Sequence, residues 1–234
     1  MWYEEALKKD TDKKVLSRKE LFLYLQAYNE SLNYNSYKWI LADLISKELI
    51  YKIGYDAYSR SKEDFIYRPL YSDKALQLEC MIEQEYPLAE FCMFESFLLN
   101  EFLNHQIAQN TFVVQVEKEL SAFIFDFLDE NWEGRTLYKP NKEAYDRYWS
   151  EGCIVIVDKI SEAPYDKQAP HSIILEKLLV DIFAEPIIRC MFSESEYPLI
   201  METAKDNYHM DLKKMLRYAR RRNATEKIKK YMEE

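Results

Sequence analysis

Three carboxylates stand at the ends of two predicted strands, where acidic side chains can hold a divalent cation. Glu117 and Glu119 follow the β-branched run Thr111–Val116, and Asp158 follows the apolar run Ile154–Val157. Oxygen ligands of this kind bind Mg²⁺ in nucleotidyltransferase and nuclease sites. In a chain that is 31% charged, however, carboxylates also reach strand ends by chance, and Glu119 equally suits the first turn of a following helix. A metal-dependent enzyme therefore stays an alternative, and we predict no metal site and no cofactor.

The other reactive residue types show no catalytic or metal-binding spacing. The histidines His105, His171 and His209 lie far apart, and each is expected to be a surface or satisfied polar residue. Three glycines are too few for a Gly-rich phosphate loop, a nucleophile elbow or a dinucleotide fingerprint. The cysteines form no CxxC pair and have apolar neighbours, which indicates buried reduced thiols at Cys80, Cys92, Cys153 and Cys190. We predict that the protein is not an enzyme.

Composition excludes several classes of protein. Apolar residues make up 48% of the 234 residues, which is enough for a packed core, and the net charge is −9. An acidic total argues against a protein that coats nucleic acid along its whole surface. The sequence has neither a basic-then-apolar leader nor an apolar run of about 20 residues, so we expect a cytoplasmic protein without membrane contact.

The first region, residues 1–70, has the pattern of helices followed by a hairpin. Ser17 and Glu20 form a capping-box pair at the start of one predicted helix. Ser36 is expected to cap the next helix, whose apolar residues from position 37 to 45 keep helical spacing. Alternating apolar residues around Gly54 then predict a tight hairpin. Helix, turn, helix and hairpin in this order indicate a winged helix-turn-helix domain.

In such a domain the second helix of the pair enters the major groove of DNA and the hairpin lies along the backbone. The residues expected to contact DNA are Asn35, Ser36, Tyr37, Lys38, Lys52, Tyr55 and Arg60. Lysine and arginine would meet phosphates, whereas asparagine and serine can meet phosphates or base edges. Because the region is nearly neutral, a winged helix that contacts only proteins is the alternative, and a homodimer would double the DNA contacts.

The second region, residues 72–234, mixes strand and helix patterns. Strands are predicted at 89–94, 111–116, 137–138 and 154–157, and helices at 72–86, 97–103 and 120–128. Repeated strand-then-helix units imply a mixed or partly parallel sheet flanked by helices, and the chain from residue 172 onward is predicted to be all-helical. The fold class is therefore mixed, α+β or α/β. The two domains are expected to join near residues 66–75, where Pro69 favours an extended link.

Basic residues concentrate near the end of the chain. Residues 201–234 carry 10 basic and 6 acidic residues. The densest cluster comprises Lys213, Lys214, Arg217, Arg220, Arg221 and Arg222. This cluster is predicted to bind a phosphate-bearing polymer or an acidic protein face. The alternative is a solvated helix whose charge offsets the acidic domain.

Several segments resemble a known family. The segment Leu49–Tyr58 resembles the N-terminal domain of AbiEi-type antitoxins of type IV toxin–antitoxin systems. Segments similar to AbiEi-related bacterial proteins follow at Leu99–Gln106, Val114–Glu119, Ile124–Leu128, Leu175–Phe183 and Leu216–Arg222. The resemblance covers most of the chain but includes no catalytic signature.

This resemblance implies an N-terminal domain that binds operator DNA and represses its own operon. It also implies a C-terminal domain, nucleotidyltransferase-like in fold, that counteracts a nucleotidyltransferase-like toxin. The DNA contacts it implies fall on Ser36, Tyr37, Lys38 and Lys52. An active nucleotidyltransferase would have a Gly-Ser pair, which this sequence lacks, and an apolar residue where Lys118 stands. The resemblance thus favours a non-enzymatic antitoxin and autorepressor; the alternatives are a winged-helix regulator with a sensing or dimerising domain and the metal-dependent enzyme.

Overall fold

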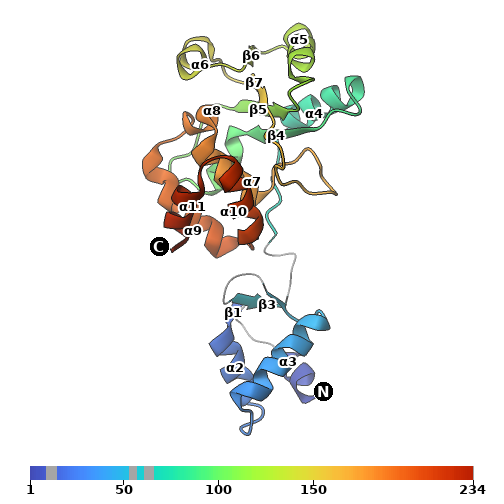
Figure 1. Cartoon of the computed structure of the whole chain (residues 1–234), viewed down its shortest axis with the longest axis vertical. Coiled ribbons are helices and arrows are strands. Elements are labelled where there is room, and N and C mark those ends of the chain that lie inside the picture. Colours follow the sequence, from blue (N-terminus) through green and yellow to red (C-terminus); the bar gives the residue numbers. More distant parts are fainter. Residues whose placement is uncertain (9–14, 53–56, 61–65, 234) are drawn as a thin grey trace. The chain divides into compact units, whose positions relative to one another are not determined.

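The computed structural model describes residues 1–8, 15–52, 57–60 and 66–233. The chain divides into two compact units (Figure 1). The N-terminal unit contains Met1–Ile66 and Asn207–Met210, and the C-terminal unit contains Tyr67–Asp206 and Asp211–Glu234. Both units mix helices with a small sheet, so the chain is a mixed α and β protein as predicted.

In the residues that the structure describes, the N-terminal unit combines three helices with a three-stranded sheet. Its elements are α1 (Trp2–Lys8), β1 (Val15–Ser17), α2 (Arg18–Gln26), α3 (Tyr34–Ser46), β2 (Tyr51–Lys52) and β3 (Ala57–Ser59). The strands run antiparallel in the order β1-β3-β2. Tyr58 is the central register position, since it pairs with Leu16 on one side and Lys52 on the other. The predicted hairpin is therefore present in β2 and β3, and the turn around Gly54 lies outside the described residues.

Helix starts in this unit follow local capping chemistry. The Ser17 side chain accepts a hydrogen bond from the Glu20 backbone N–H, and Glu20 accepts one from the Ser17 backbone N–H, which confirms the predicted capping box. The prediction that Ser36 caps α3 is wrong. Asn33 is the cap, because its side-chain oxygen accepts from the Ser36 N–H at 2.9 Å, and the helix begins three residues before the expected start.

A mixed four-stranded sheet forms the centre of the C-terminal unit. Its strands are β4 (Phe91–Glu95), β5 (Thr111–Val116), β6 (Thr136–Tyr138) and β7 (Cys153–Asp158), in the order β4-β5-β7-β6. β4 is antiparallel to β5, whereas β5, β7 and β6 run parallel. This arrangement confirms the predicted mixed sheet. The parallel strands β5 and β7 are almost wholly buried, which is why they read as continuous apolar runs.

Helices cover both faces of this sheet (Figure 1). Helices α4 (Asp73–Glu85) and α5 (Ser121–Asn131) pack on one face, where Leu78, Ile124 and Val114 belong to one apolar cluster. On the other face, Gln115 meets α7 (Leu175–Ala184). The parallel strands β5 and β7 have helices on both sides, so neither of their faces meets solvent. Their polar residues therefore lie at strand ends or, like Gln115, form a hydrogen bond with a buried partner.

The rest of the chain is the predicted helical tail with some short elements. The tail consists of α8 (Pro186–Arg189), η3 (Glu194–Glu196), α9 (Tyr197–Asn207), α10 (Leu212–Arg221) and α11 (Thr225–Glu233). The helix predicted at 97–103 is a 3-10 helix, η2 (Ser96–Glu101), and α6 (Lys142–Tyr148) is a helix that was not predicted. In the described part of the chain, no helix combines the length and the apolar character needed to cross a membrane.

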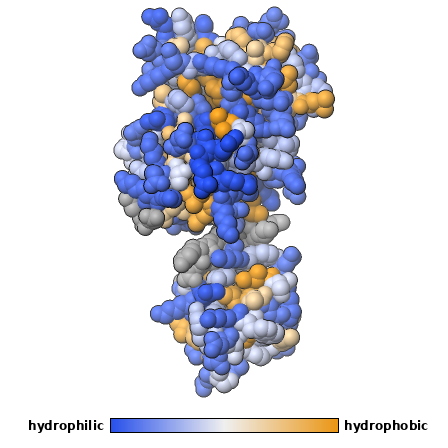
Figure 2. All heavy atoms as spheres, in the orientation of Figure 1, coloured by the Kyte–Doolittle hydropathy of each residue, from blue (hydrophilic) through white to orange (hydrophobic). Residues whose placement is uncertain are grey.

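The prediction of buried cysteines holds for Cys92 and Cys153 but is wrong for Cys80, which is exposed, and for Cys190, which is half-buried. Cys80 is exposed because α4 directs its neighbours Leu78 and Ile82 into the core and leaves position 80 on the outer face. Most of the described surface visible in Figure 2 is hydrophilic, and apolar residues reach it only in small groups. All four cysteines are free thiols.

Candidate nucleic-acid interface

The N-terminal half of α3 presents a mixed polar and aromatic surface. Asn35, Ser36 and Lys38 are exposed, as predicted for residues that contact DNA. Trp39 beside them is 61% exposed, although a tryptophan would normally be buried. The Lys38 ammonium lies 5.3 Å from the centre of the Tyr34 ring, so this aromatic side chain helps to hold the lysine in place.

The structure removes Tyr37 from the predicted contact residues. Tyr37 is completely buried, and its hydroxyl donates a hydrogen bond of 2.8 Å to the backbone carbonyl of Arg18. Its ring packs edge-on against Phe22 of α2. Helical spacing explains the error, since position 37 shares the inward stripe of Ile40 and Leu44. Tyr37 fixes α3 to α2 and does not face solvent.

The hydrogen bond from Tyr37 to the Arg18 carbonyl also brings the first turn of α2 next to the N-terminal end of α3. Arg18 and Lys19 open α2 and are both exposed. The neighbouring hydroxyl of Tyr58 is the main reason that the pKa of Arg18 is raised; Tyr34 and Tyr37 contribute in the same direction. Arg18 therefore lies among tyrosines from α3 and β3, in contact with both elements.

Lys52 completes this group from the hairpin. It is exposed on the edge strand β2 and lies directly opposite Tyr58, the tyrosine beside Arg18. Cross-strand partners project from the same side of a sheet, so Lys52 and Tyr58 share a face. We call Arg18, Lys19, Lys38 and Lys52 the cationic face. Within the described residues, no carboxylate forms an ion pair with Lys19, Lys38 or Lys52.

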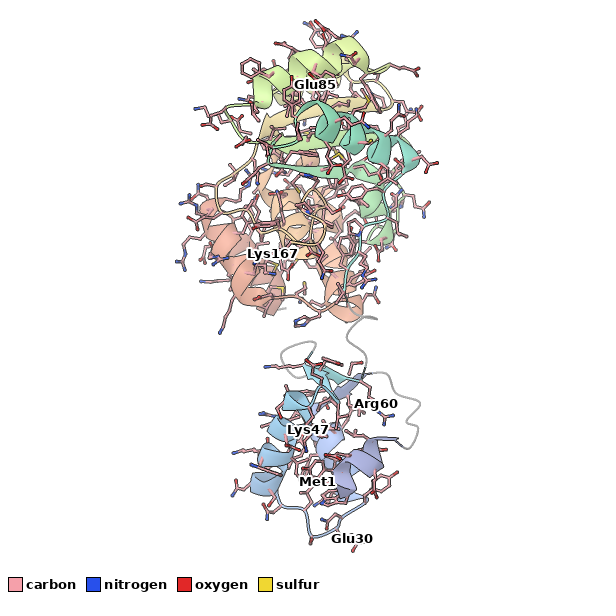
Figure 3. The ribbon with its side chains drawn as sticks, turned by 90° about the vertical axis from the view of Figure 1, so that its right-hand side faces the viewer. Met1, Glu30, Lys47, Arg60, Glu85 and Lys167 are labelled. Carbon is pink, nitrogen blue, oxygen red and sulfur yellow. The ribbon has the colours of Figure 1, made fainter. Side chains whose placement is uncertain are left out.

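The remaining two predicted contacts have different outcomes. Tyr55 lies outside the described residues. Arg60 is half-buried beside the Tyr24 hydroxyl of α2 (Figure 3). Its guanidinium therefore packs against the body of the unit, and we do not include it in the cationic face.

The C-terminal end of α3 differs because its lysine is neutralised. Lys47, labelled in Figure 3, forms ion pairs with Asp43 at 2.7 Å and with Glu4 at 2.9 Å. The hydrogen bond from Lys47 is the main cause that lowers the pKa of Glu4 to about 2. Carboxylates thus neutralise the lysine at the C-terminal end of α3. Lys38, near the N-terminal end, has no such partner among the described residues, so its charge is available to a phosphate.

The predicted basic cluster of the C-terminal unit is partly outward-facing. Lys213, Arg217 and Arg220 are exposed on one side of α10, and Lys214 is half-buried. The Arg221 side chain contacts the loop after β7. Its guanidinium donates a hydrogen bond to the Ser161 hydroxyl and lies 3.8 Å from the Glu162 carboxylate. We call Lys213, Arg217 and Arg220 the α10 stripe.

Arg222 is not part of this surface, contrary to the prediction. Its side chain is only 10% exposed and forms ion pairs with Glu185 at 2.8 Å and with Asp181 at 3.5 Å. It follows the last turn of α10 on the side of Met215 and Ala219, which both point into the core. A run of consecutive arginines on a helix must point in several directions, and one of these is inward.

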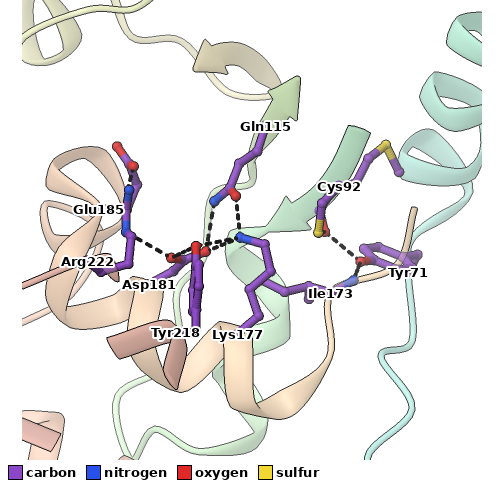
Figure 4. Close-up of polar contacts among 10 residues, drawn as sticks. Tyr71, Cys92, Gln115, Ile173, Lys177, Asp181, Glu185, Tyr218 and Arg222 are labelled. Atoms are coloured by element: carbon purple, nitrogen blue, oxygen red, sulfur yellow. Dashed lines mark hydrogen bonds and ion pairs between the residues drawn. The ribbon is translucent and has the colours of Figure 1, made fainter. Parts of the chain in front are cut away.

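Arg222 belongs to a buried polar network between β5, α7 and α10 (Figure 4). Asp181 accepts hydrogen bonds from Gln115 at 2.9 Å and from the Tyr218 hydroxyl at 2.8 Å. Lys177, also fully buried, donates to Asp181 and to Gln115. Burial lowers the pKa of Lys177, but the Asp181 carboxylate outweighs burial and leaves that pKa above its ordinary value. This network fastens the helical tail to the sheet.

The strand-end carboxylates do not form a metal centre. Asp158 forms an ion pair with Lys139 at 2.6 Å and accepts a hydrogen bond from Ser121. Glu117 and Glu119 line a separate cleft of about 340 Å³ together with Lys118 and Lys159. Throughout the ranges that the structure describes, no three His, Cys, Asp or Glu side chains are arranged to hold a metal ion.

Sequence comparison identifies a family. A family description of unknown function, DUF6577, matches residues 36–234, which is most of the chain. The protein belongs to DUF6577. The match begins within α3, so it includes Lys38 and Lys52 of the cationic face.

Other comparisons add little for this DUF6577 protein. No curated protein matches its sequence significantly. Among solved structures, it is similar to the crystal structure of the RV2827C protein from Mycobacterium tuberculosis, with 11% identity. That alignment covers 94% of this chain and 80% of the other, with a TM-score of 0.25, which does not establish a shared fold.

Sequence reasoning missed three residues of the interface in this DUF6577 protein. Arg18 and Lys19 follow Ser17 directly, so the recognised capping box already placed them in the exposed first turn of α2. What the sequence did not reveal is the Tyr37 hydrogen bond that carries this turn to α3. Trp39 falls outside the apolar spacing of Tyr37, Ile40 and Leu44, so the helical periodicity already indicated that its side chain is exposed.

Proposed function

We propose that the N-terminal unit is a winged helix-turn-helix domain that binds operator DNA. The observation that supports this proposal is the cationic face, to which α2, α3 and β2 contribute side chains that are separate in sequence. Four cations around the start of α3 match the requirement of a helix that enters the major groove between two phosphate backbones. The N-terminus of α3 adds the positive end of its helix dipole on the same side.

Each exposed group in this proposal has a distinct task. Lys19, Lys38 and Lys52 bind phosphates and set the position of α3 in the groove. Asn35 is the candidate for reading a base edge, because an amide can donate to and accept from adenine simultaneously. Trp39 supplies an apolar surface that suits a thymine methyl group.

The number of cations favours binding as a homodimer. Three phosphate contacts give a slope of log K against log salt of about −2.7, which is a weak dependence for an operator-binding protein. Two copies on two half-sites double the contacts to a slope of about −5.4. We therefore propose that a second copy of this chain binds the same operator.

The C-terminal unit is proposed to act as an antitoxin domain, and the resemblance to AbiEi-type antitoxins supports this role. The protein would then repress its own operon and counteract a nucleotidyltransferase-like toxin encoded beside it. We expect no enzymatic activity from the C-terminal unit itself. The α10 stripe is the first surface to mutate in search of the antitoxin function, since its three cations have no described carboxylate partner.

Two experiments test these proposals separately. The full chain should protect a site in the DNA upstream of its own gene and should bind a shuffled duplex of equal length far more weakly. Equal affinity for both duplexes would exclude an operator-binding repressor. Expression of the neighbouring gene should arrest growth, and co-expression of this protein should restore it. If the neighbour is toxic and this protein does not restore growth, the antitoxin role is wrong.

A winged-helix regulator with a ligand-sensing C-terminal unit is the second candidate. It is favoured by a cavity in that unit, lined by Thr111, Tyr145 and Trp149. The neighbouring gene separates the candidates, because only the antitoxin requires a nucleotidyltransferase-like partner.

A further inference from the structure

A cavity of about 370 Å³ opens at the N-terminal ends of the parallel strands of the C-terminal unit. Thr111, the first residue of β5, lies at its wall. Tyr145 and Trp149 from α6 and its C-terminal cap provide two aromatic walls, and Ile107 and Met191 provide apolar ones. Cavities of this size and composition are typical of sites for small molecules.

Hydrogen bonds hold the aromatic walls in place. The Thr111 hydroxyl accepts a hydrogen bond of 2.7 Å from the indole N–H of Trp149 and lies 3.0 Å from the Tyr145 hydroxyl. The backbone N–H of Thr111 donates to the Ser96 hydroxyl at 3.0 Å. Burial raises the pKa of Tyr145 to about 12, so its phenol is neutral at physiological pH. Both aromatic side chains are therefore oriented before any ligand arrives.

Within the ranges that the structure describes, the residues that line the cavity carry a negative charge and no positive one. Asp146 is exposed and is the one charged residue among the described residues that line the cavity. In the described part of the chain, no lysine, arginine or histidine forms an ion pair with Asp146. Some carboxylates of the C-terminal unit do have a cationic partner, as Asp158 with Lys139 and Glu90 with Lys159 show. A carboxylate left at the mouth of an aromatic cavity attracts cations and disfavours anions.

We propose that this cavity binds a small organic cation with a flat apolar body, of the class of aromatic primary amines. The ammonium would pair with Asp146, and the ring would lie against Trp149 and Tyr145. Aromatic faces favour both the ring and the adjacent positive charge, and the lost hydration of the ammonium is replaced by the carboxylate. The site is independent of the cationic face, which lies in the other unit.

The probe for this proposal is 2-phenylethylamine, which is protonated at pH 7, and its neutral analogue 2-phenylethanol is the matched ligand. Calorimetric titration of the full chain should show binding of the amine in the submillimolar range. The alcohol should bind at least tenfold more weakly, because it has the same ring but no charge for Asp146.

Three variants decide between a specific site and general apolar binding. Asp146→Asn should weaken binding of the amine at least tenfold and leave the affinity for the alcohol unchanged. Asp129→Asn, which removes an equally exposed carboxylate from α5, should change neither affinity. Ala108→Trp, on the exposed loop at the cavity, should abolish binding of both ligands by filling the space.

No binding of the amine by the wild-type chain would overturn the proposal, as would equal binding by the Asp146→Asn variant. Equal affinity for the amine and the alcohol would also overturn it, because the Asp146 carboxylate would then not favour a cationic ligand over a neutral one. The readout is ligand binding alone, so a failure of this site leaves the operator-binding proposal intact, and a failure of operator binding leaves this site intact.

Discussion

The cationic face and the basic cluster around α10 both differ from what their sequences indicate. The segment that contains α10 has the densest run of basic residues in the chain, yet Arg222 points into the core and Arg221 leans onto Ser161 and Glu162. The N-terminal region is nearly neutral, yet its fold leaves Lys19, Lys38 and Lys52, from three elements, exposed and without a described carboxylate partner, while Lys47 is neutralised. Charge density along a sequence therefore predicts which cations stay exposed and unpaired less well than the supply of carboxylate partners does.

The largest effect that we predict concerns the buried polar network around Asp181. Asp181→Ala removes the shared partner of Lys177, Tyr218 and Arg222 and leaves the buried Lys177 ammonium without its carboxylate. We expect the C-terminal unit to lose about 3–5 kcal/mol of unfolding free energy. Urea unfolding of the full chain, followed by tryptophan fluorescence and near-UV circular dichroism, measures this loss.

Glu162→Ala is the matched control, since it removes the exposed partner of Arg221 from a pair that is 3.8 Å apart. This variant should lose less than about 1 kcal/mol. Similar losses in the two variants would mean that the network around Asp181 does not fasten the tail to the sheet.

The next effect is a difference in stability between variants of Arg222 and of Arg220, which lie two residues apart. Arg222→Ala breaks the pairs with Glu185 and Asp181 and should destabilise the C-terminal unit by about 2–4 kcal/mol. Arg220→Ala on the α10 stripe should change stability by no more than about 0.5 kcal/mol. Thermal unfolding of both variants under the same conditions is sufficient. Equal melting temperatures would contradict the inward orientation of Arg222.

A smaller effect tests a residue of the cationic face that sequence reasoning missed. Lys19→Gln removes one phosphate contact, so we expect the salt slope of operator binding to fall by about one for each copy bound. Stability should stay within about 0.5 kcal/mol, because Lys19 is exposed. Competition binding at several salt concentrations measures the slope. A lost affinity with an unchanged slope would indicate that Lys19 acts on the fold and not on a phosphate.

The smallest effect concerns the neutralised end of α3. The pKa of Glu4 is lowered to about 2, so its ion pair with Lys47 stabilises the fold above the ordinary carboxyl pKa. That contribution is lost as the pH falls from about 5 toward 2. Lys47→Gln should return the Glu4 pKa toward its ordinary value, which a carbon-detected NMR titration of the side-chain carboxyl can follow. An unchanged titration of Glu4 in this variant would contradict the assigned pair.

Local patterns predicted most of the fold. Branched residues in Thr111–Val116 and in Ile154–Val157 predicted the two central strands, and Ser72 and Ser17 predicted helix starts. Boundaries that depend on competing local hydrogen bonds were less predictable. Asn33 and Ser36 are both good caps, and only the structure shows that the earlier one is used.

The candidate sites were less predictable, because they depend on contacts between distant residues. Position and charge predict Tyr37 and Arg222 as contact residues, whereas tertiary packing turns both inward. Arg18 joins the cationic face through a hydrogen bond that spans 19 residues. The cavity beside Trp149 requires a helix, α6, that no periodicity in the sequence indicated.

The salt dependence of operator binding tests the central claim most directly. Fluorescence anisotropy would follow the full chain on its own upstream DNA between 50 and 200 mM salt for the wild type, Lys38→Ala/Lys52→Ala and Lys47→Gln. The double variant should bind more weakly, with a slope reduced by about two for each copy bound, and Lys47→Gln should match the wild type. An unchanged slope in the double variant, or an equal reduction in Lys47→Gln, would contradict the assignment of the cationic face as the DNA-binding surface.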